Sequence, residues 1–146
     1  MTRGKLIYIT NDRGDSLCSP EFNGDMGSDM VCGQLAIERL KNCKDVDSFK
    51  DIVIKFLKEY GYEEDYSEEE MKEERFLREI NIVARNFAQP EYFDWWFSDY
   101  LYLLNNTGSS IETRDYHENK IQINPGLTVL CFGSIDEEAM KELENK

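Results

Sequence analysis

The chain has 146 residues and a formal net charge of −13, and it contains eight Phe, eight Tyr and two Trp. This aromatic content excludes a disordered acidic chain, and the length predicts one domain, residues 1–146. The acidic balance excludes direct nucleic-acid binding, because phosphate contacts need a basic face. No apolar run is long enough for a membrane span or a secretory signal. We therefore expect a cytoplasmic protein with no membrane contact.

The first half of the chain predicts one strand followed by helices. The apolar run within 5–10 is typical of a strand, and the Gly-, Asp- and Asn-rich segment 11–28 predicts a long loop. A first helix is expected over 29–42. The second helix is the clearest element, because apolar residues recur at helical spacing from Phe49 to Tyr60, with Asp47 as the expected cap.

A third helix is predicted to begin at Ser67, where Ser67-Glu68-Glu69-Glu70 has the pattern of a capping box. Its expected inner face consists of apolar residues at helical spacing: Phe76, Ile80, Val83, Ala84 and Phe87. Pro90 bounds this helix, and the first part of the aromatic segment that follows predicts a short fourth one.

Beyond Tyr100 the apolar period changes from 3.6 to 2, which predicts strands. Four are expected, over 100–104, 110–116, 120–123 and 127–132. The short turns between them predict an antiparallel meander, followed by a short C-terminal helix. The expected fold is therefore α+β. An antiparallel sheet of about five strands, the N-terminal strand plus the meander, would pack against a bundle of three to four helices.

Negative charge is concentrated in the middle of the chain. Residues 45–99 carry sixteen acidic and seven basic side chains, whereas residues 1–44 are balanced. Nine carboxylates fall within 59–74, and they must repel one another. One interpretation of these carboxylates is that they form a helix face exposed to solvent. The other is a polyanionic surface that imitates nucleic-acid backbone and occupies the basic groove of a nucleic-acid-handling protein.

The second interpretation is the leading functional hypothesis, a non-enzymatic acidic binding protein with a basic protein partner. The residues expected to bind this partner are the carboxylates Glu63, Glu64, Asp65, Glu68, Glu69, Glu70, Glu73 and Glu74, which we call the acidic run, with Trp95 and Trp96 as an apolar anchor. In size, charge and lack of catalytic motifs the chain is similar to the small acidic proteins with which phages block host defence enzymes. That similarity implies an inhibitor, although no specific residue carries it.

Two alternatives remain open. Four aspartates between Asp12 and Asp29 could supply oxygen ligands for a metal-assisted hydrolase. A structural adaptor could instead bind through the aromatic segment 92–100 or through a sheet edge.

Other chemistry has little support in the sequence. The four cysteines have no metal-binding spacing and are expected to remain reduced. The single histidine, His117, falls in an expected hairpin turn without a nucleophile motif. We expect no catalytic residue, no resident metal and no cofactor.

Overall fold

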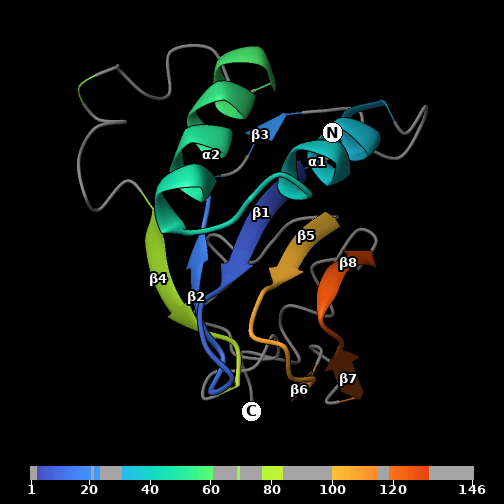
Figure 1. Cartoon of the computed structure of the whole chain (residues 1–146). Coiled ribbons are helices and arrows are strands. Elements are labelled where there is room, and N and C mark those ends of the chain that lie inside the picture. The colour runs from blue at the N-terminus through green and yellow to red at the C-terminus, as the bar shows by residue number, and fades with distance from the viewer. Residues whose placement is uncertain are drawn as a thin grey trace, which may run out of the picture.

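The computed structural model of the chain describes residues 3–20, 22–23, 31–60, 69, 77–83, 100–114 and 119–131. Two helices and eight strands lie within these ranges (Figure 1). In chain order they are β1 (Arg3–Ile9), β2 (Asp15–Cys18), β3 (Phe22–Asn23), α1 (Val31–Leu40), α2 (Val46–Tyr60), β4 (Arg78–Asn81), β5 (Tyr100–Asn105), β6 (Ile111–Arg114), β7 (Lys120–Ile123) and β8 (Gly126–Cys131).

The main sheet is mixed, and its strand order is β4-β2-β1-β5-β8, with β3 also pairing with β1. The two central strands, β1 and β5, run parallel, with Leu6 opposite Tyr102, and the other pairs in this sheet are antiparallel. Strands β6 and β7 form a separate hairpin between β5 and β8 along the chain. The predicted antiparallel meander is therefore wrong, because β5 pairs with β1 and β8 rather than with β6.

The predicted bundle of three to four helices is also wrong. The described part of the chain contains two helices longer than a turn, and a strand replaces part of the third predicted helix. Ile80 lies in β4, which pairs with β2, and Val83 lies in the turn that follows and is 44% exposed. Glu69 is helical, as predicted, but the other residues of 61–76 and the fourth predicted helix lie outside the described residues.

Helix α2 agrees with the sequence except at its cap. Asp45, not the predicted Asp47, precedes the helix, and its Oδ1 accepts a hydrogen bond of 2.8 Å from the Ser48 backbone N–H. The Ser48 hydroxyl accepts one of 3.0 Å from the Asp45 N–H in return. Donation from the Ser48 backbone N–H, followed by a hydrogen bond from the Ser48 side chain, holds the pKa of the Asp45 carboxyl below its ordinary value. The reciprocal pair satisfies two backbone donors that a helix start otherwise leaves unpaired.

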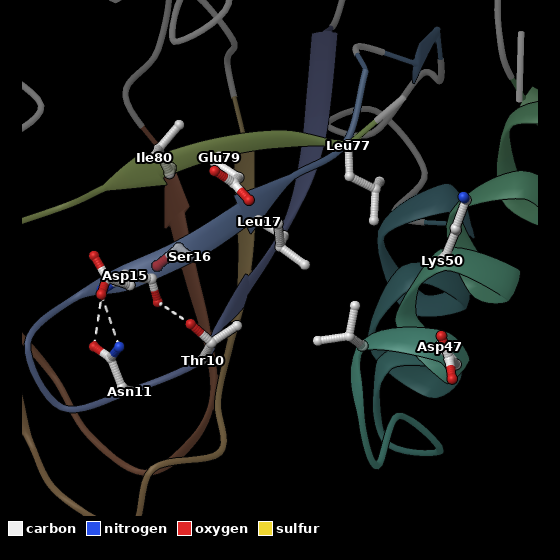
Figure 2. A pocket seen from close by; sticks show the side chains of 11 residues that line it. Thr10, Asn11, Asp15, Ser16, Leu17, Asp47, Lys50, Leu77, Glu79 and Ile80 are labelled. Carbon is white, nitrogen blue, oxygen red and sulfur yellow. Dashed lines mark hydrogen bonds between the residues drawn. The ribbon is translucent and has the colours of Figure 1, made fainter. Parts of the chain in front are cut away.

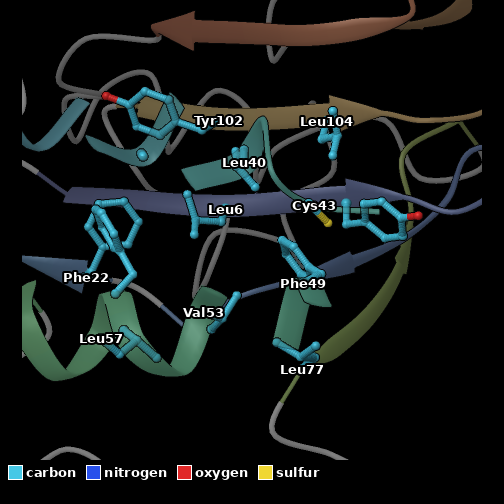
Figure 3. Packing of buried hydrophobic residues seen from close by; sticks show 13 residues of the cluster. Leu6, Phe22, Leu40, Cys43, Phe49, Val53, Leu57, Leu77, Tyr102 and Leu104 are labelled. Atoms are coloured by element: carbon cyan, nitrogen blue, oxygen red, sulfur yellow. The ribbon is translucent and has the colours of Figure 1, made fainter. Parts of the chain in front are cut away.

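The two faces of the main sheet bury different side chains, because successive residues of a strand point to opposite faces. Leu6 of β1 packs toward the helices with Phe49 of α2 (Figure 3), and Tyr8 of β1 belongs to the same cluster. Ile7 and Ile9 pack on the opposite face, in a cluster that includes Ile111 and Ile123 of the β6–β7 hairpin. Both faces of β1 are therefore buried, which agrees with the nearly continuous apolar run that predicted this strand.

Candidate binding cleft

The turn between β1 and β2 contains a network of hydrogen bonds around one carboxylate. Asp15 accepts a hydrogen bond of 2.7 Å at Oδ2 from the Asn11 amide (Figure 2). It accepts another of 2.8 Å at Oδ1 from the Asn81 amide. The Asn11 donation is the largest cause that lowers the pKa of Asp15, followed by the Asn81 donation, since both favour the ionised form. One oxygen of this carboxylate therefore joins β2 to β4, and the other holds the β1–β2 turn.

Gly14 allows the same turn to pass close to the residues that follow β4. Its φ is +91°, a left-handed conformation, and a Cβ there would lie 2.6 Å from Cγ2 of Val83. The Gly14 carbonyl accepts a hydrogen bond of 3.1 Å from the Ile82 N–H. The Ile82 carbonyl in turn accepts a hydrogen bond from the buried Thr113 hydroxyl of β6. The turn thus links the sheet edge to the hairpin.

Beside this turn an open cleft of about 750 Å³ separates the β2–β4 edge of the sheet from the N-terminal part of α2. Figure 2 shows Leu17, Leu77 and Glu79 on the sheet side, and Asp47 and Lys50 across from them on α2. The cleft is lined by Thr10, Asn11, Asp15, Ser16, Leu17, Val46, Asp47, Lys50, Leu77, Glu79 and Ile80. It therefore combines apolar walls with charged groups.

Carboxylates outnumber cations in this cleft. Asp15, Asp47 and Glu79 line it together with a single lysine, Lys50. Asp15 is engaged by the two asparagine amides, whereas Asp47 and Glu79 are exposed and form no ion pair with a described cation. The electrostatics of the cleft consequently favour a positively charged group over an anion.

Most of the predicted partner-binding residues lie outside the described residues. These are Glu63, Glu64, Asp65, Glu68, Glu70, Glu73, Glu74, Trp95 and Trp96. Glu69 is described, and it is exposed and has no ion pair with a described cation. Glu59, the first carboxylate within 59–74, accepts a hydrogen bond of 2.6 Å from Nη2 of Arg39. The protein's own arginine therefore neutralises Glu59 but not Glu69.

The aspartates proposed as metal ligands are only partly described. Asp12 is exposed and Asp15 is held by asparagine amides, while Asp25 and Asp29 lie outside the described residues. Among the described side chains, no group of three or more His, Cys, Asp or Glu is placed to hold a metal ion. The hydrogen bonds from Asn11 and Asn81 give Asp15 a structural role, because they join the β1–β2 turn to β4.

Two of the four cysteines, Cys18 and Cys43, lie in the described part of the protein with their side chains buried. Both are free thiols, and burial raises the pKa of each, that of Cys18 to about 11. A thiol with so high a pKa carries little reactive thiolate near neutral pH. The side chains of Cys32 and Cys131, and all of His117, lie outside the described residues.

Sequence reasoning did not identify the cleft, because its walls come from segments far apart in the chain. Glu79 is on β4 and Asp47 is on α2, and the sequence predicted a helix where β4 lies. The sequence contained one local indication of the turn beside the cleft. Asn11 and Asp15 flank Gly14, a pattern typical of a structured turn rather than of an open loop.

Comparison with protein-family models, with curated proteins and with solved structures finds no match to this chain. Within the described residues, neither helix has the length and apolar character needed to span a membrane.

Proposed function

We propose that this protein is a non-enzymatic, cytoplasmic binding protein that docks a basic protein partner through its carboxylates. The observation that carries the proposal is the excess of nine negative charges in residues 45–99, within a net charge of −13. Such an excess opposes compaction through self-repulsion. A positively charged partner would relieve that repulsion, and opposite charges would also accelerate the encounter.

The described residues support this proposal at two places. Glu69 offers a carboxylate of the acidic run that no described cation neutralises. The cleft adds Asp47 and Glu79, which are likewise without an ion pair to a described residue. Glu59 is left out of the proposed surface because Arg39 already pairs with it.

The finer proposal concerns the kind of partner. A series of carboxylates along the acidic run could replace the phosphates that a nucleic-acid-handling protein binds in an Arg- and Lys-rich groove. Occupying that groove would inhibit the partner, as the similarity to phage inhibitors implies. Nucleic-acid mimicry then means that the protein itself binds no nucleic acid, because like charges repel.

Fluorescence anisotropy with a labelled octa-arginine peptide tests the charge-driven binding. The test variant changes Glu63, Glu64, Glu68 and Glu69 to Lys. A matched control makes the same change in charge at four exposed carboxylates elsewhere, Asp12, Glu38, Asp51 and Glu112. We expect the test variant to bind at least about tenfold more weakly than the control, since opposite charges meet at the acidic run.

Two results would count against the proposal. If the wild-type protein does not bind octa-arginine at low ionic strength, there is no accessible polyanionic surface. If the test and control variants bind equally weakly, net charge alone governs the interaction and the acidic run is only a solvated face. Circular dichroism of each variant establishes that it is folded.

A second candidate is the adaptor that binds through a sheet edge. Strand β8 contains no charged residue, and Val129 within it is 42% exposed. No other described strand pairs with its outer edge. Uncharged edge strands can accept a further strand from another chain. Such an interface would persist at about 0.5 M NaCl, where exposed charge pairs are screened, so salt separates the two candidates.

A further inference from the structure

The cleft between the β2–β4 edge and α2 has two kinds of wall. Leu17 and the buried Leu77 line the sheet side, and Val46, which is 44% exposed, lines the α2 side. A cleft whose lining combines apolar and charged side chains is suited to a side chain that is itself apolar along its stem and charged at its tip. Lysine and arginine are such side chains, because their methylene stems pack on apolar surface while the charged end stays in water.

The charged side chains of the cleft favour a ligand of positive charge. Asp47 and Glu79 come from opposite walls and form no ion pair with a described cation. Lys50 supplies one positive charge against three carboxylates in the lining. An anionic or a fully apolar ligand would leave these carboxylates uncompensated, whereas a cation would offset them.

We propose that this cleft receives one lysine or arginine side chain of the basic partner, with the stem against Leu17 and Val46 and the charged end at Asp47 and Glu79. This inference rests on the proposed function and assigns a specific site to it. The acidic run would provide the long-range attraction, and the cleft would fix the register of the partner by holding one side chain.

The test uses the same octa-arginine peptide with the full chain. The cleft variant is Asp47→Asn with Glu79→Gln. Its matched control is Asp51→Asn with Glu112→Gln, which also removes one exposed helix carboxylate and one exposed strand carboxylate. We expect the cleft variant to bind about fivefold more weakly than the wild type, and the control to change by less than about twofold.

A steric variant tests the same site without changing its charge. Val46→Phe would fill part of the cleft from an exposed position, so the core remains intact. We expect it to weaken peptide binding by a similar factor. Thermal melting of each variant establishes that it is folded at the assay temperature.

The outcomes separate this inference from the proposed function. If the wild type binds octa-arginine but the cleft variant weakens no more than its control, the cleft is not the site, while the acidic run still accounts for binding. Unchanged binding by Val46→Phe would overturn the cleft assignment in the same way. A wild type that does not bind the peptide at all overturns the proposed function and this inference together.

Discussion

The two faces of the main sheet achieve burial in different ways. The face beneath α1 and α2 buries large aromatic rings, with Tyr8 stacked on Phe49 at 5.5 Å and Phe22 against Phe56 at 4.6 Å. The opposite face buries aliphatic side chains, among them Ile7 of β1. Helix α2 contributes the rings of Phe49 and Phe56 to the first face. The β6–β7 hairpin contributes Ile111 and Ile123 to the second, and these are side chains suited to a pleated surface.

The face covered by the β6–β7 hairpin, which we call the hairpin face, is also held by hydrogen bonds. The Thr113 hydroxyl of β6 bonds to the Ile82 carbonyl, and the Ile82 N–H bonds to the Gly14 carbonyl. Asp15 in the same turn holds Asn81 of β4. The hairpin face therefore combines aliphatic burial with hydrogen bonds at the β1–β2 turn. The helical face combines aromatic burial with hydrogen bonds from the Asn106 amide to the Tyr8 hydroxyl and to the Lys44 carbonyl.

The largest expected effect lies on the helical face. Phe49→Ala removes a fully buried ring and its stacking on Tyr8, so it should lower the free energy of unfolding by about 3–5 kcal/mol. Urea denaturation measures this change. Lys55→Ala, at an exposed position of the same helix, should stay within about 0.5 kcal/mol of the wild type. A loss of under about 1 kcal/mol for Phe49→Ala would show that burial beneath α2 is not the main stabilising factor.

A smaller effect is expected at the turn that supports the hairpin face. Gly14→Ala and Gly108→Ala both place Ala at a positive φ, +91° and +81°, which costs about 1–2 kcal/mol. Only Gly14→Ala also brings a Cβ against Val83, whereas Gly108 has open space around it. Gly14→Ala should therefore lose more stability than Gly108→Ala.

Removing the clash should recover part of this difference. Because Val83 is 44% exposed, Val83→Ala has little core packing to lose, and the double variant Gly14→Ala with Val83→Ala should be more stable than Gly14→Ala alone. Equal losses for the two single glycine variants would contradict the close approach of the turn to Val83.

The smallest expected effect depends on pH. Asparagine hydrogen bonds hold the pKa of Asp15 below its ordinary value in the folded protein. Its contribution to stability is thus present above the unfolded pKa of about 3.9 and is lost as the pH falls through the lower folded pKa. Asp15→Asn should consequently reduce the acid-induced loss of stability, as measured by urea midpoints from about pH 5 downward. Asp12→Asn, in the same turn, should keep the wild-type slope, and parallel curves for all three proteins would contradict the role of Asp15.

The sequence predicted elements whose signal is local. The spacing of Phe49, Val53 and Phe56 identified α2, and all three residues are buried in the structure. Strands β5 and β7 were predicted within one residue of their observed ends from their period-2 patterns. In each case the periodicity of a single segment contained the necessary information.

The prediction failed where distant segments determine the structure. The spacing of Ile80 and Val83 suits a helix, but pairing with β2 makes a strand of the segment that contains Ile80. Likewise, no local pattern indicates that β5 pairs in parallel with β1, far away in the chain. The cleft could not be predicted for the same reason, because its carboxylates Glu79 and Asp47 come from β4 and α2, which are distant in the chain.

The most direct test of the central claim is the salt dependence of octa-arginine binding by the wild-type protein. If carboxylates drive docking, the affinity should fall steeply between about 0.05 M and about 0.5 M NaCl, because exposed charge pairs are screened over that range. The acidic-run variant should bind weakly throughout. Wild-type affinity that is unchanged across this range would contradict a charge-driven interaction and would favour an uncharged interface such as the edge of β8.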